Sequence, residues 1–205
     1  MFSDIGLFIL SVIGISLSGV ILPGPLTAAT IAKGFNDKNA GIMIGVGHGL
    51  VELPIILLIY FGFATFITYP LVAKIVGVLG GLMLIFLGFM LLRSLGKKLG
   101  QAADLPSNPF MTGIIMTGTN PYFYLWWTTI GMALIFGSTR FGIAGLIIFL
   151  VIHWICDIGW EQVVSFTVFK TRHLWTTNVR QLVFVVCAIF LMGFGVWFGV
   201  SVFVS

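Results

Sequence analysis

The sequence predicts an all-α fold: a polytopic membrane protein of six transmembrane helices, built as an inverted repeat of three helices plus three. This prediction rests on composition, on six long apolar segments and on motifs that occur once in each half. Of the 205 residues, 59% are hydrophobic and only 8% are charged, whereas soluble domains carry about 25% charged residues. Such a small number of charges cannot cover a water-facing surface. The whole chain, residues 1–205, is therefore assigned to one transmembrane domain.

The six apolar segments are each long enough to cross a bilayer, which takes about 20 residues. The first follows Asp4 rather than a basic stretch, so we expect it to be a true span and not a cleavable signal peptide. The longest connection, residues 96–109, separates repeat halves of about 1–98 and 108–205. The predicted spans are residues 5–33, 40–67, 72–95, 110–135, 142–169 and 179–204.

Basic residues near the span ends indicate the orientation in the membrane, because they resist translocation. Only Lys74 and Arg140 flank the second and fourth loops. The first, third and fifth loops are flanked by Lys33, Lys38, Arg93, Lys97, Lys98, Lys170, Arg172 and Arg180. The odd loops are therefore predicted to be cytoplasmic, and both termini to lie outside.

The first span contains the sequence Pro23-Gly24-Pro25. Proline removes a backbone hydrogen bond and clashes with the preceding helical turn, so we expect the span to be broken there. The helix that follows would start with Pro25, and its free N–H groups and positive dipole end would form a site for a carboxylate. Thr27 and Thr30 would add hydroxyl ligands to that substrate site.

The fourth span contains Asn120-Pro121, which predicts a second break entered from the opposite side. Broken helices are tolerated within a membrane only where the freed backbone is buried in protein or faces a watery cavity. The alternative for both breaks is a proline kink that only shapes helix packing.

The second span of each half carries a histidine with an acid four residues later: His48 and Glu52 in HGLVE, His153 and Asp157 in HWICD. This spacing puts each pair on one helix face. Glu161 continues the line from His153 and Asp157. Because charges at the bilayer centre are costly, such residues face the bundle interior and usually mark an ion or substrate path. The five are predicted to take part in proton or cation coupling.

A structural role is the alternative for these residues. Each histidine could hydrogen-bond the acid of its own helix to form a link between helices, and Glu161 could lie at the cytoplasmic interface. The recurrence of a proline break and a His-x3-acid pair in both halves favours function. Three spans per half would bring the second copy into the membrane from the opposite side, which is the inverted repeat of many secondary transporters.

Glycines one helical turn apart predict close helix packing. Gly41, Gly45 and Gly49 form such a stripe, and Gly77/Gly81 and Gly195/Gly199 repeat the spacing.

Other classes of function find little support. Cys156 and Cys187 form no CxxC pair and are expected to be small buried apolar residues. The chain has no G-x-S-x-G or H-E-x-x-H motif, so it is predicted not to be an enzyme, and no cofactor or bound metal is expected. The net charge of +4 is scattered over loops, which argues against a nucleic-acid partner.

The PGP break, the passage KGFNDKNAGIMIGVGHGL and the NP in TGTNPYFYLWW resemble the LysE (lysine exporter) type of amino-acid translocator over essentially the whole chain. The resemblance implies a multi-pass exporter of the plasma (inner) membrane, with an amino acid and protons as partners, driven by the proton motive force and often considered dimeric. The matching positions are Pro23, Gly24, Pro25, Asn120 and Pro121. The superfamily also includes exporters of divalent metals.

Two functions follow as hypotheses. In the first, the chain exports a small amino acid or related metabolite by alternating access. The helix breaks bind its α-carboxylate, while Glu52 and Asp157 bind the amino group, the coupling proton, or each in turn. In the second, two histidines and three carboxylates serve the export of a divalent cation such as zinc or manganese.

Overall fold

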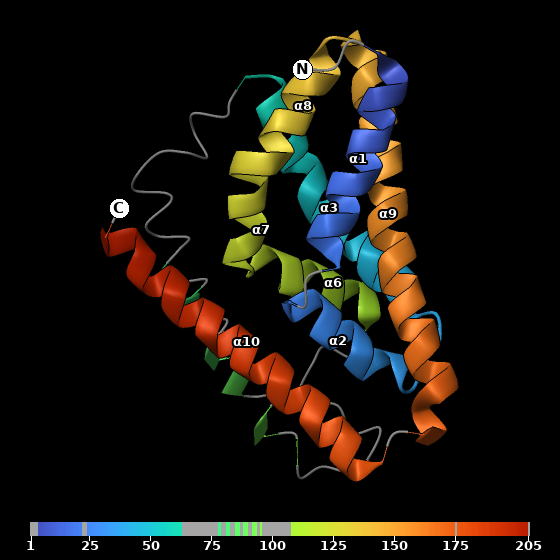
Figure 1. Ribbon diagram of the computed structural model, residues 1–205, viewed down its shortest axis with the longest axis vertical. Helices are drawn as coiled ribbons and strands as arrows, with labels where there is room; N and C mark the ends of the chain where they lie inside the picture. The colour runs from blue at the N-terminus through green and yellow to red at the C-terminus, as the bar shows by residue number, and fades with distance from the viewer. Residues whose placement is uncertain are drawn as a thin grey trace.

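The computed structural model describes residues 4–21, 24–62, 108–174 and 176–204, together with scattered positions between 78 and 95. The described elements are all helical, which confirms the predicted fold class at the level of an all-α membrane protein (Figure 1). Pro23, most of the predicted span 72–95 and the connection that follows it lie outside the described residues. The helices are α1 (Ile5–Val20), α2 (Pro25–Gly34), α3 (Ala40–Tyr60), α6 (Pro109–Gly118), α7 (Pro121–Trp126), a π-helical turn (Trp127–Gly131), α8 (Met132–Thr139), α9 (Gly142–Thr171), a 3-10 turn (Arg172–Leu174) and α10 (Thr177–Val204).

Several helices match the length and composition of membrane spans. In the part of the chain that the structure describes, α3 and the helical run 142–174 are each long and apolar enough to cross a bilayer, and α1 with α2 meets the same criteria as a bent pair, either a broken span or a re-entrant loop. The angle between α1 and α2 is 74°. Helix α10 adds 28 further helical residues.

The first predicted span is two helices. Helix α1 is capped by the Asp4 carboxylate, which accepts a hydrogen bond from the Gly6 N–H (2.8 Å), and it ends at Val20. Helix α2 starts with Pro25 in its first turn, and Gly24 at its N-cap offers no side chain to the free N–H groups.

The fourth predicted span is divided further than the sequence indicated. It breaks between Gly118 and Pro121 and then contains the π-helical turn at Trp127–Gly131, a second irregularity that was not predicted.

The second predicted span ends earlier than its apolar pattern suggested. Helix α3 stops at Tyr60, whereas residues 40–67 were predicted to be helical. Two residues later Gly62 has φ of +89°, a left-handed conformation that glycine adopts without strain and that commonly follows a helix. Within α3 the helix continues through Pro54, so proline alone does not break a span in this fold.

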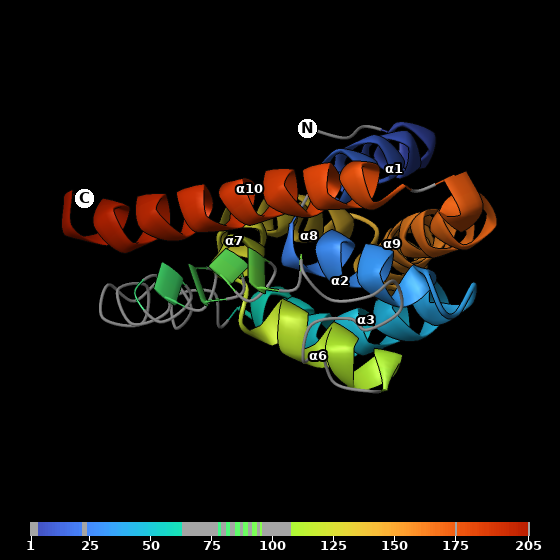
Figure 2. The same cartoon turned by 90° about the horizontal axis from the view of Figure 1, so that it is seen from below.

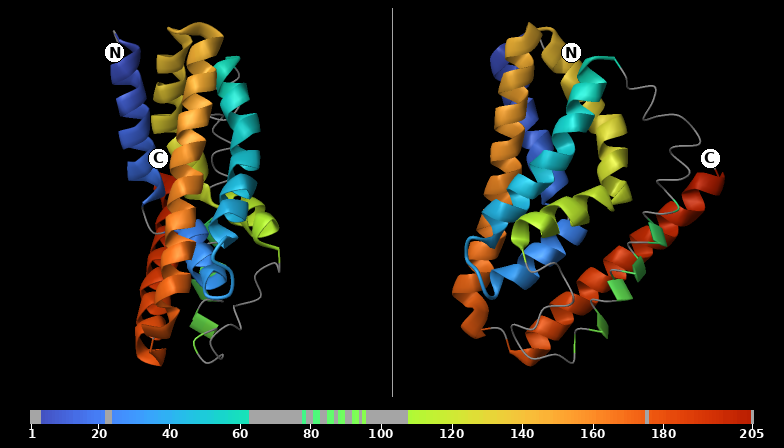
Figure 3. Two further views of the ribbon diagram at one scale, coloured as in Figure 1. Left: turned by 90° about the vertical axis from the view of Figure 1, so that its right-hand side faces the viewer. Right: turned by 180° about the vertical axis from the view of Figure 1, so that it is seen from behind.

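Helix α9 packs against four other helices, α1, α2, α3 and α8. Figure 2 shows α2 lying between α10 on one side and the α3–α6 layer on the other, and α2 contacts all three. The start of α1, the end of α3 and the turn from α8 to α9 lie at one end of the molecule, and the turn after α2 and the end of α9 lie at the other (Figures 1 and 3).

Basic residues gather at the second of these ends. Lys33 and Lys170 are in the last turns of α2 and α9, and Lys38 and Arg172 follow those helices in the chain. Arg140 follows α8 at the opposite end. The basic residues of the described helices thus lie mainly at one end, and both the orientation in the membrane and the six-span repeat stay predictions.

Glycines set the distances between α3 and its neighbours, as the stripe at residues 41, 45 and 49 predicted. A Cβ on Gly41 would collide with the carbonyl group of Glu161, one on Gly45 would lie 2.9 Å from the Ile158 Cα, and one on Gly49 would lie 3.1 Å from the Trp154 ring. This stripe packs α3 directly on α9.

A second set of glycines packs α3 on α6. Here a Cβ on Gly47 would meet the Phe110 carbonyl, and one on Gly113 would meet the Ile44 carbonyl. In α10, a Cβ on Gly195 would lie 2.6 Å from the carbonyl of Gly81. Gly77 and the contacts of Gly199 lie outside the described residues.

Candidate functional site

Two histidines and two acids meet where α3 crosses α9. On α3, His48 Nε2 lies 2.9 Å from the Glu52 carboxylate, and on α9, His153 Nε2 lies 3.2 Å from that of Asp157. Both pairs are four residues apart, so one helical turn brings each histidine to its own acid, as the sequence predicted.

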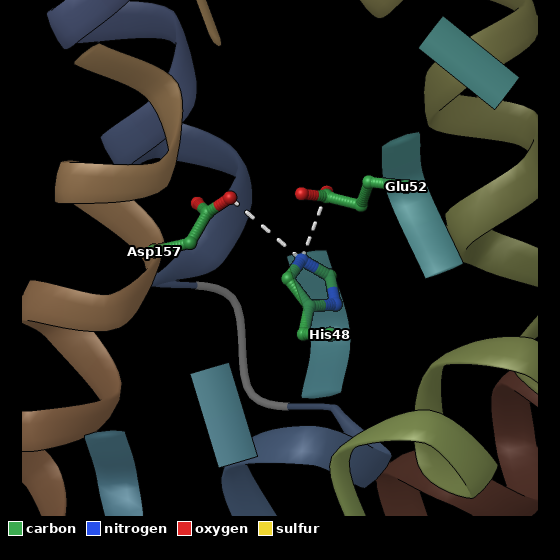
Figure 4. A group of neighbouring side chains, drawn as sticks. All are labelled: His48, Glu52 and Asp157. Carbon is green, nitrogen blue, oxygen red and sulfur yellow. Dashed lines mark ion pairs between the residues drawn. The ribbon is translucent and has the colours of Figure 1, made fainter. Parts of the chain in front are cut away.

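The two pairs also contact each other. His48 Nε2 is 3.7 Å from the Asp157 carboxylate, and His153 Nε2 is 3.4 Å from that of Glu52. Figure 4 shows the His48 imidazole between Glu52 and Asp157, which come from opposite helices. Each imidazole therefore faces both acids, and we call His48, Glu52, His153 and Asp157 the His–acid quartet.

The quartet is almost completely enclosed. Glu52, His153 and Asp157 are each 2–3% exposed, and the His48 side chain is 13% exposed. Because removing one partner of a buried ion pair leaves an uncompensated charge, the four groups depend on one another for stability. With both imidazoles protonated and both acids ionised, the quartet has no net charge.

The second nitrogen of each histidine is bound by a hydroxyl group. His153 Nδ1 lies 2.7 Å from Ser16 Oγ of α1, and His48 Nδ1 lies 2.8 Å from Thr117 Oγ1 of α6. Neither hydroxyl residue belongs to a motif that the sequence predicts to be functional. Their only signal was a polar residue within an apolar helix, which Ser18 and Thr119 share.

The two histidines have different surroundings. His153 is sandwiched between Trp126 and Phe149, with ring centroids 5.4 Å away on both sides, and the Trp127 ring meets its edge at 5.3 Å. His48 has the edge of Phe123 at 5.9 Å. The aromatic residues come from α7, α9 and the π-helical turn, so the irregular fourth span encloses His153.

A cavity of about 180 Å³ adjoins the quartet. It extends to the break between α1 and α2, where the uncapped start of α2 forms part of its wall. It also reaches the second break, at Asn120. Its lining comprises Ser16, Gly19, Val20, Gly24, Pro25, Leu26, Thr27, His48, Glu52, Thr117, Asn120, Tyr122, Phe123, Trp126, Trp127, His153, Asp157 and Glu161.

Glu161 differs from the quartet acids in having no ion-pair partner among the described residues. The residue is 0% exposed, and neither carboxylate oxygen is hydrogen-bonded. The Thr30 hydroxyl of α2 lies beside it and is also completely buried. Packing of α2 and α3 on α9 encloses Glu161 within the protein.

The second break uses its asparagine as a helix cap. Asn120 Oδ1 accepts a hydrogen bond from the Tyr122 N–H (3.1 Å), and α7 begins at Pro121. The first break lacks such a cap, so the two breaks, although similar in sequence, present different groups to the cavity. Thr27 lines the cavity, whereas Thr30 is buried beside Glu161.

Three quartet atoms lie close enough to meet one cation. The ligand atoms of His48, Glu52 and Asp157 are all within 4.8 Å of one another. In this conformation the same atoms are paired with each other, and the arrangement is a ring of ion pairs. Cys156 on α9 is a half-buried free thiol, and the side chain of Cys187 lies outside the described residues.

Comparison with known proteins covers most of the chain. Residues 17–202 match the family described as "LysE type translocator". A protein of Bacillus subtilis (strain 168) named "Putative amino acid efflux protein YcgF" is 26% identical over 194 residues, which is 92% of either chain. No solved structure matches.

The matched region contains both helix breaks, the His–acid quartet and Glu161. The family consists of transporters, which confirms the prediction that the chain is not an enzyme, and the resemblance seen in the PGP and NP motifs is confirmed as well. Its long apolar helices and this match over nine-tenths of its length lead to one conclusion: the chain belongs to the LysE type translocator family.

Proposed function

We propose that this protein exports a small amino acid or related metabolite across the plasma (inner) membrane in exchange for protons. The observation that carries the proposal is the cavity, which has an uncapped helix start on one side and buried acids on another. A free amino acid carries a carboxylate and an ammonium group on neighbouring atoms, so a site of this kind complements both. The similarity to a protein named for amino acid efflux supports the same substrate class.

The start of α2 is the proposed site for the α-carboxylate. Pro25 has no N–H. The N–H groups of the residues that follow it in the first turn have no capping side chain, because the N-cap residue is Gly24. Helix N-termini favour negative charge through these N–H groups and the helix dipole. Thr27 is at the cavity wall within this first turn.

Glu161 is the proposed site for the ammonium group. A buried carboxylate without a partner is costly, and an ammonium donor would supply the missing hydrogen bonds. Thr30, beside Glu161, is five residues beyond Pro25, or about 7.5 Å along the helix axis. A small zwitterion spans this distance with one hydrogen bond at each end.

The His–acid quartet is the proposed proton site. Its acids already have imidazole partners, so they are less available to the substrate than Glu161 is. Histidine gains and loses protons near neutral pH, and the neighbouring acids compensate the charge that it gains. Quartet and substrate site share one cavity, so the charge of one influences binding at the other.

Alternating access would expose this cavity to each side in turn. The two breaks at Gly24-Pro25 and Asn120-Pro121 divide their spans beside the cavity and provide points about which the half-helices can move. An inverted repeat of three plus three spans would relate the two breaks, as in other transporters. The resemblance to the family also leads us to propose a homodimer as the assembled form.

Purified protein in liposomes with an imposed pH gradient tests the proposal. We expect the pH gradient to drive the amino acid in the direction opposite to the proton flow. Conversely, an amino-acid gradient imposed across the membrane should drive protons the opposite way. In Glu52→Gln combined with Asp157→Asn, the gradient should lose its effect while the protein still folds. Amino-acid movement that ignores the gradient in the wild-type protein would remove the coupling claim.

Export of a divalent cation is the second candidate. It is favoured by the clustering of His48, Glu52 and Asp157 within 4.8 Å, since imidazole and carboxylate are ligands for zinc and manganese. A thermal-unfolding screen of purified protein against amino acids and divalent metals separates the candidates. Stabilisation by metals alone would replace the first proposal with the second.

A further inference from the structure

We infer that Ser16 and Thr117 are positioning residues, which hold the two imidazoles so that each Nε2–H points at the acids in both protonation states of the ring. The inference rests on the proposed proton site. It concerns two residues outside the His-x3-acid motifs, one on each of the helices that end at a break.

The arrangement is the same at both histidines. Each Nε2 faces Glu52 and Asp157 at 2.9–3.7 Å, and each Nδ1 faces a hydroxyl at 2.7–2.8 Å. The hydroxyls are buried, with Ser16 1% and Thr117 2% exposed. Each hydroxyl also comes from the other half of the chain: Ser16 binds His153, and Thr117 binds His48.

A hydroxyl is the side-chain group that suits both states of an imidazole. When the ring is neutral with its proton on Nε2, the hydroxyl donates its hydrogen to Nδ1. When the ring is protonated, Nδ1–H donates to the hydroxyl oxygen, and the hydroxyl hydrogen turns to a carbonyl one turn back in its own helix. The heavy atoms stay in place in both states.

Other partners would favour one state. A carboxylate at Nδ1 would accept only, and its charge would hold the ring protonated. A backbone carbonyl would also accept only, so Nδ1 would have to carry the hydrogen. In the neutral ring, Nε2 would then have a lone pair that faces the quartet acids. A ring that must load and release a proton beside two acids therefore needs a partner that both donates and accepts.

Neighbouring hydroxyls show that this contact is specific. Two residues beyond Ser16, the Ser18 hydroxyl donates to the Ile15 carbonyl (2.7 Å), and two residues beyond Thr117, the Thr119 hydroxyl donates to the Ile115 carbonyl (2.6 Å). Bonding within the same helix is the usual behaviour of these residues. Ser16 and Thr117 instead reach across to α9 and α3.

The location of the two hydroxyls connects the rings to the breaks. Ser16 is one turn from the end of α1 and Thr117 is next to last in α6, so each lies on the segment just before a break. Movement of either segment during transport would change one hydroxyl–imidazole distance. The other titratable or charged groups that line the same cavity are Glu52 on α3, Asp157 and Glu161 on α9, and Tyr122 on α7.

The test compares Ser16→Ala and Thr117→Val with the matched controls Ser18→Ala and Thr119→Val in the full-length protein. Transport in liposomes is measured against pH, and Nδ1 is followed by nitrogen NMR of histidine-labelled protein, with the exposed His173 as internal reference. We expect the Nδ1 signal of His153 to move in Ser16→Ala and that of His48 in Thr117→Val.

Transport should change in a defined direction. The hydroxyl bond is stronger to a charged ring than to a neutral one, so its loss should move the midpoint of the pH–rate profile to lower pH by roughly 0.5 to 1 unit. Ser16→Thr and Thr117→Ser, which keep a hydroxyl, should restore the wild-type midpoint. The two controls should leave both readouts unchanged.

Two results would overturn the inference: a wild-type pH profile in both hydroxyl-free variants, or equal shifts in variants and controls. If Ser16→Ala does not fold, Ser16→Cys replaces it, because a thiol donates and accepts only weakly. Absence of coupled transport in the wild-type protein would reject the proposed function instead, while the nitrogen signals would still report whether the hydroxyls hold the rings.

Discussion

At the scale of single residues, the acids of the cavity differ in whether their carboxylates have partners. Glu52 and Asp157 each face two imidazoles, whereas Glu161 has none. An unpaired charge in a membrane interior costs about 2.5 to 3.5 kcal/mol even on insertion scales. Whether a buried acid has a partner therefore matters more than where it lies along its helix. This difference is the reason that Glu161 is the acid proposed to bind a ligand.

Glu161→Gln tests this division between the acids. We expect amino-acid binding to weaken by about 10- to 100-fold, because a charge-assisted hydrogen bond contributes about 1.5–3 kcal/mol. The free energy of unfolding should stay equal or rise, since the change removes an unpartnered carboxylate. Calorimetric titration and thermal unfolding measure the two effects.

Asp37→Asn is the matched control for this prediction, because Asp37 is an exposed acid of the turn after α2 and its amide can still accept the Asn39 N–H. It should bind amino acid as the wild type does. Binding by Glu161→Gln within about twofold of wild type, or equal loss in both variants, would assign Glu161 a structural role; twofold is under 0.5 kcal/mol.

At the scale of elements, glycine contacts decide how closely α3 approaches α6 and α9. The backbone of α6 lies against Gly47, and that of α3 lies against Gly113. In a membrane, where burying apolar side chains against one another gains little over lipid, such close backbone contact is a main source of helix association. The quartet depends on it, because its two pairs are on different helices.

Gly47→Ala is expected to lower the free energy of unfolding by about 1–3 kcal/mol, because its Cβ would collide with the Phe110 carbonyl. Gly159→Ala in α9 is the control, since nothing lies within 4 Å of its added Cβ. That change should be neutral or stabilising by up to about 1 kcal/mol, as alanine favours the helix. Reversible unfolding in detergent measures both, and equal effects would contradict the packing described here.

The break in the fourth span gives a second prediction for elements. Asn120 and Asn108 each cap a helix that begins with proline, and their side-chain oxygens accept hydrogen bonds of 3.1 and 2.9 Å from the N–H of the residue after that proline. Asn120→Ala and Asn108→Ala should therefore each cost about 1 kcal/mol of stability. Only Asn120 lines the cavity.

Transport should accordingly fall in Asn120→Ala and remain in Asn108→Ala. Flux into liposomes, corrected for the amount of folded protein, distinguishes the two variants. A matching loss of flux in both would mean that capping strength, rather than position at the cavity, explains the effect.

At the scale of the whole molecule, the two ends of the bundle differ in charge. The described turns after α2 and α9 are basic, and the turn after α8 carries Arg140. Because basic segments resist translocation, this asymmetry predicts that the basic end of the bundle is cytoplasmic. The proposed proton-driven export would require such a fixed orientation, because substrate and proton would move in opposite directions.

Single cysteines introduced in a variant with Cys156→Ser and Cys187→Ser test the orientation. In intact cells, a cysteine at position 140 should react with a membrane-impermeant thiol reagent, and one at position 38 should react only after the cells are opened. The cysteine-free variant should keep its transport activity. The reverse labelling pattern would invert the topology and would place the termini inside.

Much of the site was predictable because helical periodicity is local. The spacing of His48 and Glu52, and of His153 and Asp157, places each pair on one helix face wherever the helices pack. Likewise, Pro25 and Pro121 begin helices because proline lacks the N–H that the first turn does not use. These features depend on residues no more than about one turn apart.

The end of α3 and the π-helical turn were not predictable in the same way. Apolar residues continue beyond Tyr60, and hydrophobicity does not reveal where the backbone takes a left-handed turn at Gly62. Nor does it reveal the wider turn at Trp127–Gly131, where Trp127 packs against His153.

The sequence by itself determined an all-α membrane chain, its two breaks and its two His–acid pairs, because composition and helical period are local properties. Only the tertiary structure decided that the pairs form one quartet, that Glu161 has no partner, and that Ser16 and Thr117, rather than Ser18 and Thr119, hold the imidazoles. Those facts depend on the angle and distance at which α1, α3, α6 and α9 cross. Backbone contacts at glycine set that geometry for α3, α6 and α9, and the packing of α1 on α9 brings together residues 137 positions apart.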